Sequence, residues 1–361
     1  MIVTELKLRN FRNYESAGIT LSPGINYLSG DNAQGKTNLL ESLVYLSLTR
    51  SFRIGDDSLL IRNGSEFANL ACTVRETRDI RLEAVIHSNG KTLSVNRRPV
   101  SKTSEFIGIL NTVLFSPDDL TIYTDAPRDR RRLLDQEITK VSSGYLSALK
   151  NYRNLLKDRN SLLKQFHPDE AYLEVLEERL VKESIPLIEQ RTAFINSINQ
   201  TLPGYYRMLS GEEASAVLLY HCCIERKNPQ EELRILYKET RQRDIEFHST
   251  GSGIHREDIS FSLHGQNVIN SASQGQKRMM MLAFKLAIMN YIETISKQKA
   301  VLLLDDVLSE LDRERQMKLM NLIKGPYQCV ITGTELPQFL NDGTQKEFHV
   351  EHGRIREALH E

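Results

Sequence analysis

The loop at residues 30–37 constrains this chain more than any other stretch. Its sequence, GDNAQGKT, matches the phosphate-loop pattern G-x-x-x-x-G-K-[ST] at every fixed position. The run before it, 25–29, alternates like a strand, and the run after it, 38–46, has apolar residues at helical spacing. A strand, a glycine loop and a helix in this order present backbone N–H groups and a helix N-terminus to an anion. We therefore expect a bound nucleoside triphosphate.

Each residue type in the loop suits a phosphate ligand. Gly30 and Gly35 let the backbone curl inward, Lys36 should reach the β- and γ-phosphates, and the Thr37 hydroxyl should bind Mg²⁺. The whole loop is the expected binding set: Gly30, Asp31, Asn32, Ala33, Gln34, Gly35, Lys36 and Thr37. Arg12 and Asn13 follow the first predicted strand and could also reach the nucleotide, although ordinary turn residues would explain them equally well.

A second candidate site lies where a wholly apolar run, 300–304, ends in Asp305 and Asp306. Such a run is typical of a central parallel strand. Asp305 at its end should bind Mg²⁺, and Asp306 should either deprotonate the attacking water or only position it. Adjacent carboxylates repel each other unless a cation is near, which favours a functional site over a strand that ends in solvated acids.

Composition limits the possible partners and the setting. The 361 residues suggest two domains, and Lys plus Arg equals Asp plus Glu at 47 each, so a polyanion must be bound by a local patch. No apolar run approaches a membrane span, and the N-terminus lacks a secretory pattern, so we expect a cytoplasmic protein. Cys222 and Cys223 should alternate faces on a strand, and with Cys72 and Cys329 they show no C-x-x-C spacing. We therefore expect neither a metal site nor a disulfide.

A charged, helical region begins near residue 128. Apolar residues at three- and four-residue spacing over 149–163 and 173–187 predict two helices packed as an antiparallel hairpin, with Arg159 interrupting the first seam and Pro186 kinking the second helix. The seam of the first helix is expected at Leu149, Tyr152, Leu156 and Leu163. Seven basic residues could bind phosphates, although a solvated face is an equal alternative. They are Arg130, Arg131, Arg132, Lys140, Lys150, Arg153 and Lys157.

Two later segments also have features of anion sites. His255, in a glycine-rich turn, could approach a phosphate or could be a structural turn residue. Ser273, Gly275 and Gln276 lie just before a long apolar helix predicted over 279–292. A small hydroxyl and a glycine at a helix N-terminus form a second place that accepts an anion.

Together these motifs resemble the heads of ABC-type ATPases. The segment 272–276 is similar to their signature motif, and 309–312 is similar to the loop after Walker B. The gap between phosphate loop and signature, about 230 residues, is wider than in a transporter head, and the helical arm is much shorter than in SMC proteins. From end to end, the order of motifs resembles the RecF family of bacterial recombination mediators. The matching segments are 11–14, 30–37, 51–53, 127 with 130–135, 255–258, 273–276 and 305–306.

The departures from that family are modest. The segment 124–127 lacks an expected glycine, and Glu257 stands where an aspartate is common. Thr332 and Thr334 occupy the region where transporter heads place a switch histidine, so the residue that senses the γ-phosphate stays open.

The resemblance implies an α/β fold: an ABC-type P-loop ATPase head, with a mixed central sheet and an antiparallel subdomain, plus an inserted helical arm. It implies an N-terminal head part at 1–127, the arm at 128–240 and a C-terminal head part at 241–361. In such heads, Ser273, Gly275 and Gln276 of one copy would cap the γ-phosphate bound at Lys36 of a second copy. The implied catalytic residues are Lys36, Asp305, Asp306, Ser273 and Gln276, with Thr37 and Asp305 on Mg²⁺.

The implied activity is a weak, DNA-stimulated ATPase whose ATP-bound homodimer clamps DNA. RecF-like proteins act with RecO and RecR to help load RecA at gaps next to duplex junctions. The sequence contains no base-reading element, so we expect contacts to the phosphate backbone of duplex and gapped DNA. A transporter-type ATPase subunit and an SMC-like scaffold with a vestigial site are the alternatives; the helical arm disfavours the first, and the intact Lys36, Thr37 and aspartates disfavour the second.

Overall fold

The computed structural model describes residues 1–213, 215–340 and 345–358. The run 214–220 has the residue pattern of a strand, and its first residue, Ala214, lies outside the described residues. The chain forms two compact units. The first comprises Met1–Leu120, Gly204–Glu213 and Arg278–Glu361, and the second comprises Thr121–Pro203 and Ala214–Lys277. Among the described helices, none has the length and apolar character that a membrane span requires.

The first unit contains an antiparallel sheet in the order β2-β1-β4-β5-β6-β7, which corresponds to the antiparallel subdomain that the resemblance implies. The Asn89-Gly90 turn joins β5 to β6, and apolar side chains of β1, β4 and β5 enter one core. The strands are β1 (Ile2–Phe11), β2 (Tyr14–Thr20), β4 (Phe67–Arg75), β5 (Asp79–His87), β6 (Gly90–Val95) and β7 (Arg98–Pro99).

The second sheet of this unit is mixed, in the order β15-β14-β3-β13-β12-β8. Its strands are β3 (Ile25–Ser29), β8 (Thr112–Phe115), β12 (Val301–Leu304), β13 (Cys329–Thr332), β14 (Lys346–Glu351) and β15 (Arg354–Glu357). The pairs from β8 to β14 are parallel, and only β15 runs antiparallel to its neighbour. Because parallel strands end at the same edge, the loops after β3, β12 and β13 converge there.

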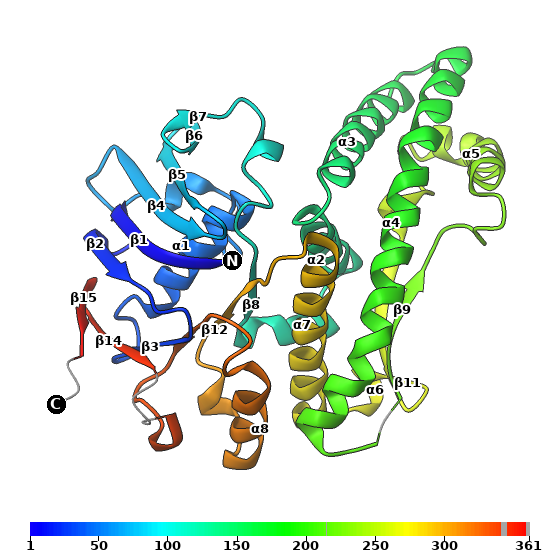
Figure 1. Ribbon diagram of the computed structural model, residues 1–361. Helices are drawn as coiled ribbons and strands as arrows, with labels where there is room; N and C mark the ends of the chain where they lie inside the picture. The colour runs from blue at the N-terminus through cyan, green and yellow to red at the C-terminus, as the bar shows by residue number, and fades with distance from the viewer. Residues whose placement is uncertain (214, 341–344, 359–361) are drawn as a thin grey trace. The chain divides into compact units, whose positions relative to one another are not determined.

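Helix α1 (Lys36–Leu48) lies between these two sheets and contacts β4 and β5 of one and β8 and β13 of the other. Figure 1 shows α1 behind the strands of the antiparallel sheet. Residues around nearly the whole circumference of α1 are buried, which explains why its apolar residues are not confined to a single stripe. The unit also contains α8 (Arg313–Ile323) and most of α7 (Gln274–Ser296).

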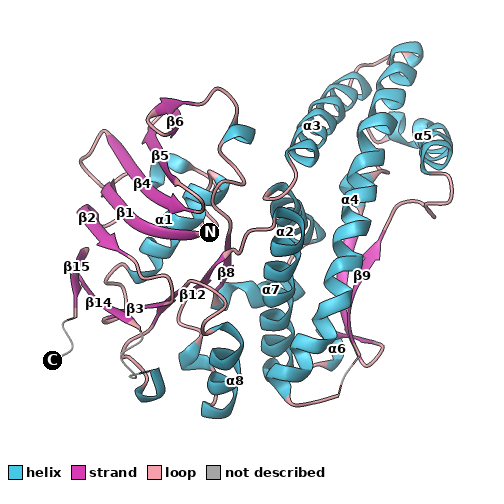
Figure 2. Ribbon diagram, in the orientation of Figure 1, coloured by secondary structure: helices cyan, strands magenta, loops and turns pink. Residues whose placement is uncertain are grey.

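The second unit is mainly helical, with one small antiparallel sheet in the order β11-β10-β9 (Figure 2). Its strands are β9 (Ala216–His221), β10 (Asp258–Leu263) and β11 (Gln266–Asn267). Its helices are α2 (Pro127–Thr139), α3 (Ser143–Leu163), α5 (Pro229–Glu246), α6 (Val268–Ser271) and the larger part of α4 (Glu170–Ser210). Of the arm expected at 128–240, residues 128–203 and 215–240 belong to this unit. The unit also includes 241–277, which were expected in the C-terminal head part. Short 3₁₀ turns are η1 (Asp57–Leu60), η2 (Thr103–Glu105), η3 (Pro117–Tyr123), η4 (Ile254–Arg256), η5 (Leu308–Glu310) and η6 (Gln338–Leu340).

Helix α3 buries a slightly different face from the one predicted. Leu155 is buried in place of Leu156, and the buried positions continue through Arg159 at helical spacing. The guanidinium of Arg159 has no exposed surface and donates to Glu177 and Asp244, each across 2.8 Å. The residue expected to interrupt the seam is therefore part of it, because two carboxylates neutralise its charge.

Candidate functional site: the phosphate-loop cleft

A cleft of about 540 Å³ lies in the first unit, at the edge where the parallel strands of the mixed sheet end. The loop after β3, the loop after β12 and the end of β13 all contribute to its lining. Seven of the predicted site residues line this cleft: Asn32, Ala33, Gly35, Lys36, Thr37, Asp305 and Asp306. The structure thus brings together two motifs that lie 268 residues apart in the chain.

The phosphate loop has the backbone that its glycines predict. Gly30 and Gly35 adopt φ values of +142° and +119°, and a Cβ at position 30 would lie 2.3 Å from the carbonyl oxygen of Val350. The buried Lys36 ammonium donates to the carbonyl oxygens of Gly30, at 2.5 Å, and Asp31, at 2.7 Å. Burial lowers the pKa of Lys36, while Asp306 and Asp305 oppose that shift. The Lys36 side chain is therefore held against the backbone of the loop.

Asn13 supports the loop through its side chain. Its Nδ2 donates across 2.8 Å to the carbonyl oxygen of Gln34, and its Oδ1 accepts from Asn38 across 2.9 Å. Gln34 is also held from the C-terminal hairpin, because the N–H of His352 donates to its Oε1 at 2.7 Å. Asn13 thus fixes the conformation of the loop that is expected to bind phosphate.

Arg12 is directed at Glu41 of α1. Its Nε and Nη2 donate to the two carboxylate oxygens across 2.8 and 2.7 Å, and Glu41 is completely buried. A two-point guanidinium–carboxylate pair fixes both orientation and charge. Of the two alternatives for Arg12, this geometry favours a structural turn residue that locks the first strand to α1.

Asp305 lies at the centre of the site. Its Oδ1 accepts from the Thr37 hydroxyl at 3.0 Å and from the Thr332 hydroxyl at 2.8 Å. The pKa of Asp305 is raised, because burial outweighs these hydrogen bonds and the charge of Arg53, which lower it. Asp306 follows with φ of +53°, and its N–H donates to Thr332 across 2.9 Å. One threonine therefore positions both aspartates.

These residues fit a hard divalent cation. The Thr37 hydroxyl and the Asp305 carboxylate are already within hydrogen-bond distance, and both are oxygen donors of the kind that Mg²⁺ prefers. A bound cation would also offset the cost of burying the Asp305 carboxylate, with Asp306 next to it. Thr37 and Asp305 would hold Mg²⁺, which would neutralise phosphate charge when bound.

In the second unit, the segment expected to be a signature motif forms a capping box. The N–H of Ser273 donates to the side chain of Gln276 at 3.0 Å, and the N–H of Gln276 donates to the Ser273 hydroxyl at 3.2 Å. Ser273 is exposed, and α7 begins at Gln274. The N-terminus of α7 is therefore well formed and open to an anion.

The comparisons with known proteins agree with this geometry. The model of the RecF/RecN/SMC N terminal domain matches residues 2–345. A protein of Lachnoclostridium phytofermentans named DNA replication and repair protein RecF is 38% identical over 347 residues, covering 95% of each chain. The chain belongs to the RecF family. A solved structure of the recombination mediator protein RecF with ATP, from the RecFOR pathway, matches with a TM-score of 0.92 at 30% identity, covering 99% of this chain and 97% of that chain.

Membership of the RecF family confirms the predicted fold class and disfavours the transporter-subunit and scaffold alternatives. The Smc head domain of Pyrococcus furiosus, crystallised with an extended coiled coil and the C-terminal domain of ScpA, matches with a TM-score of 0.58 at 18% identity, covering 99% of this chain and 95% of that chain. That likeness concerns the fold, and it agrees with an ABC-type ATPase head.

Four of the seven basic residues that the sequence suggested as a phosphate-binding face form ion pairs or hydrogen bonds within the protein. Arg130 pairs with Asp258 at 2.7 Å, and Arg131 donates to the carbonyl oxygen of Glu257. Lys140 is buried against Glu137 at 2.6 Å, and Arg153 reaches Asp135 at 3.0 Å. For Arg130 and Lys140, whose paired charges are largely shielded from solvent, this geometry favours a structural role, whereas phosphate contact by the other five basic residues stays a prediction.

His255 takes the structural role. Its Nε2 lies 3.0 Å from the carbonyl oxygen of Thr250, which can only accept, so Nε2 carries the proton and Nδ1 accepts from the Tyr152 hydroxyl at 2.8 Å. Burial lowers the pKa of His255 to about 4. A neutral, doubly hydrogen-bonded imidazole is a poor ligand for phosphate.

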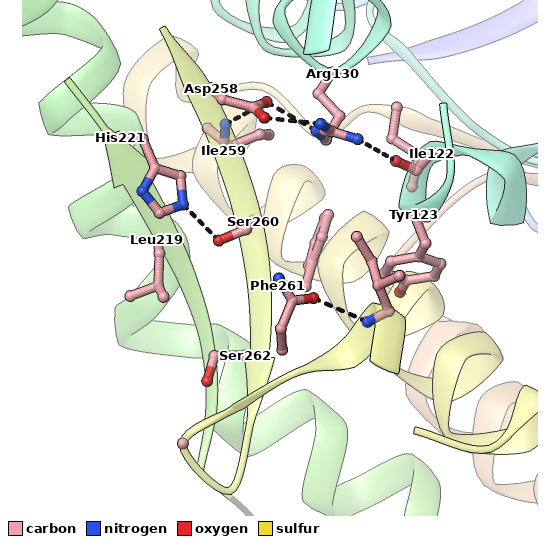
Figure 3. A pocket seen from close by; sticks show the side chains of 13 residues that line it. Ile122, Tyr123, Arg130, Leu219, His221, Asp258, Ile259, Ser260, Phe261 and Ser262 are labelled. Atoms are coloured by element: carbon pink, nitrogen blue, oxygen red, sulfur yellow. Dashed lines mark hydrogen bonds and ion pairs between the residues drawn. The ribbon is translucent and has the colours of Figure 1, made fainter. Parts of the chain in front are cut away.

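A second cavity, of about 400 Å³, lies in the second unit along β9 and β10 (Figure 3). Four of its polar side chains form two pairs: Arg130 with Asp258, and His221 with Ser260 at 2.7 Å. Apolar side chains such as Leu219 and Phe261 complete the lining. The charges of this cavity are already balanced within the protein, unlike the paired aspartates of the first cleft.

Cys222 and Cys223 do not alternate across a strand, which corrects the prediction. Strand β9 ends at His221, so both residues lie beyond its pleat. The Cys222 thiol donates to the carboxylate of Glu257 at 3.2 Å, and the N–H of Cys223 reaches the same oxygen at 3.3 Å.

Sequence reasoning missed three contributors to the phosphate-loop cleft. Thr332 was considered only as a replacement for a switch histidine, yet its hydroxyl holds Asp305. Arg53 lines the cleft and donates to Asn38 at 3.0 Å, although only its place in the family pattern drew attention to it. The turn at His352 braces Gln34, and no motif marks it.

Proposed function

We propose that this chain is an ATP-dependent DNA-binding protein of recombinational DNA repair that binds ATP with Mg²⁺ in the phosphate-loop cleft. The observation that carries the proposal is the hydrogen bond between Thr37 and Asp305, because it joins the phosphate loop to the carboxylate at the end of β12. Relatives named DNA replication and repair protein RecF, and a solved RecF structure with ATP, support it.

In this proposal the expected loop residues cradle the triphosphate, and Lys36 faces the β- and γ-phosphates. Asp306 orients or deprotonates the attacking water, and its neighbour Asp305 holds Mg²⁺ together with Thr37. As the resemblance to RecF-like proteins implies, we expect ATP hydrolysis to be slow and to be stimulated by DNA. Hydrolysis then releases the protein from DNA.

We further propose that the active form is a head-to-tail homodimer. Ser273, Gly275 and Gln276 at the exposed start of α7 would cap the γ-phosphate bound at Lys36 of a second copy. The two copies would clamp duplex DNA near gaps and junctions through its phosphate backbone, and with RecO and RecR they would assist RecA loading. The division into head parts 1–127 and 241–361 around an arm at 128–240 belongs to this proposal.

Complementation between two inactive variants tests the shared site. Lys36→Ala removes the phosphate-loop cation, and Ser273→Arg blocks the start of α7. In a heterodimer of the two, one of the two composite sites has both an intact Lys36 and an intact Ser273. Mixing of equal amounts should restore turnover to about a quarter of the wild-type value when all three kinds of dimer form equally, since half the dimers are then mixed and each has one intact site.

Light scattering supplies the independent readout and the control. Wild-type protein should dimerise with Mg²⁺ and a non-hydrolysable ATP analogue in the presence of short duplex DNA, and Lys36→Arg should fail to do so. Ser271→Ala is the matched control, because this exposed serine lies outside the capping box. A protein that stays monomeric with the analogue, or a mixture without recovered turnover, contradicts the proposed dimer.

A further inference from the structure

Outside the nucleotide cleft, Cys222, Cys223 and Glu257 form a cluster of metal-ligand type in the second unit. One ligand atom from each residue, two thiol sulfurs and a carboxylate oxygen, can be chosen so that all lie within 4.8 Å of one another. Glu257 directly follows η4, while the cysteines directly follow β9, so the cluster joins two segments of the unit. None of these three side chains has a role in the proposed nucleotide chemistry.

The carboxylate of Glu257 is oriented before any ligand arrives. It is buried, and its Oε2 accepts from Arg191 at 2.6 Å and from the Tyr220 hydroxyl. The remaining oxygen, Oε1, receives the Cys222 thiol and the N–H of Cys223. One oxygen is therefore fixed by the protein core, and the other is directed at the thiols.

The two cysteines are half-buried, so a small cation can reach them. Loss of both thiol protons beside the Glu257 carboxylate would bring three negative charges together, which is costly without a compensating positive charge. A divalent cation supplies that charge, and with Arg191 it balances two thiolates and one carboxylate.

We propose that Cys222, Cys223 and Glu257 bind one thiophilic divalent cation of the Zn²⁺ class. Thiolate sulfur with a carboxylate oxygen is a donor set that suits Zn²⁺ and Cd²⁺ and does not suit Mg²⁺. On binding, two S–H bonds break, two metal–sulfur bonds form and two protons are released to solvent. The oxygen of Glu257 exchanges its thiol hydrogen bond for the cation, and no electron is transferred.

The test uses the full chain, kept reduced by a phosphine and free of nucleotide, with Cd²⁺ as the probe. Thiolate–Cd²⁺ charge-transfer absorption should saturate at one Cd²⁺ per chain with release of two protons, and Zn²⁺ should suppress it. Cys222→Ser and Cys223→Ser should each weaken binding at least tenfold, and the double variant should lose the absorption band. Cys72→Ala is the control, because it removes a buried thiol of the first unit and keeps the pair.

Two results overturn the proposal: an absorption band that persists in the double variant, or wild-type protein without a band. Glu257→Gln is less decisive, since it also removes a partner of the buried Arg191. The serine variants avoid that problem, and circular dichroism establishes that they are folded.

Discussion

Thr332 and Asp305 are joined by a hydrogen bond of 2.8 Å between the ends of two neighbouring parallel strands. The same threonine hydroxyl accepts the N–H of Asp306 at 2.9 Å. Asp306 adopts a left-handed backbone conformation, with φ of +53°, which is unfavourable for a residue with a side chain. Thr332 therefore stabilises a strained turn and directs one aspartate at Thr37 while fixing the backbone of the next.

Replacing Thr332 with Val removes the hydroxyl and keeps the shape of the side chain. The N–H of Asp306 then loses its partner, and Oδ1 of Asp305 keeps only the Thr37 hydroxyl, which should cost about 1–3 kcal/mol of folding stability. We expect ATP turnover to fall about tenfold or more, since both aspartates lose their orientation. Steady-state hydrolysis and urea unfolding measure the two effects.

Thr332→Ser is the matched variant, because it retains the hydroxyl and removes only a methyl group. The Thr332→Ser variant should keep most of the ATP turnover that the Thr332→Val variant loses. Equal turnover in the Ser and Val variants would show that the hydroxyl does not position the aspartates.

The C-terminal hairpin supports the phosphate loop at Gly353. This residue has φ of +72°, and a Cβ there would lie 2.5 Å from the carbonyl oxygen of Asn13. Gly353→Ala should therefore displace Asn13, and with it Gln34, and should weaken nucleotide binding about tenfold in equilibrium titrations.

Gly64→Ala is the control that distinguishes the effect of the contact with Asn13 from the effect of backbone strain alone. Gly64 has a similar φ, +81°, with no atom within 4 Å of the added Cβ. Its variant should lose about 1 kcal/mol of stability and keep its nucleotide affinity. If both variants bind nucleotide equally well, the hairpin does not support the loop.

The elements that sequence reasoning predicted well are those with a strong local pattern. Strand β3, the phosphate loop and α1 follow each other within 24 residues, from Ile25 to Leu48, and each has its own periodicity or glycine signal. Strand β12 was recognisable because a strand buried on both faces has an unbroken apolar run. The convergence of Thr37 and Asp305 then follows, because parallel strands share one edge.

Contacts without a local pattern could not be predicted. The bond from His352 to Gln34 spans 318 residues and uses a backbone N–H, which leaves no trace in residue type. The ion pair between Arg12 and Glu41 depends on how β1 and α1 are packed against each other. The approach of Cys222 to Glu257 depends on β9 ending at His221, before both cysteines, and strand ends are weakly encoded in sequence.

Arg159 supplies a prediction for the stability of the second unit. Arg159→Met would leave the buried Asp244 without its ionic partner, since this guanidinium is the group that pairs with it in the described structure. Breaking a buried pair from one side should cost about 3–5 kcal/mol. Urea unfolding, followed by circular dichroism, measures the loss.

Arg234→Met is the comparison, because Arg234 pairs with Glu178 at a similar distance, 2.8 Å, on the surface. An exposed pair should contribute less than about 1 kcal/mol. Arg159→Lys retains the charge and should recover part of the loss. A loss at Arg159 no larger than the one at Arg234 would refute the role assigned to the buried cluster.

His255 should make the second unit sensitive to acid. Burial lowers its pKa to about 4 in the folded protein, against 6.5 for an exposed histidine. Below pH 6.5 this histidine binds a proton in the unfolded chain but stays neutral in the folded chain until about pH 4. The free energy of unfolding therefore falls as the pH drops from 6.5 toward 4. Above 6.5 both states are neutral and this residue contributes no pH dependence.

His255→Gln retains one donor and one acceptor without a titrating group. Between about pH 7.5 and about pH 5, wild-type protein should lose about 2 kcal/mol more stability than the variant, since each pKa unit corresponds to about 1.4 kcal/mol. Urea unfolding at the two pH values gives the difference, and the carboxylates common to both proteins cancel from it. The same pH dependence in both proteins would mean that His255 is protonated in the folded state, and its hydrogen bonds to Tyr152 and Thr250 would then have to be reassigned.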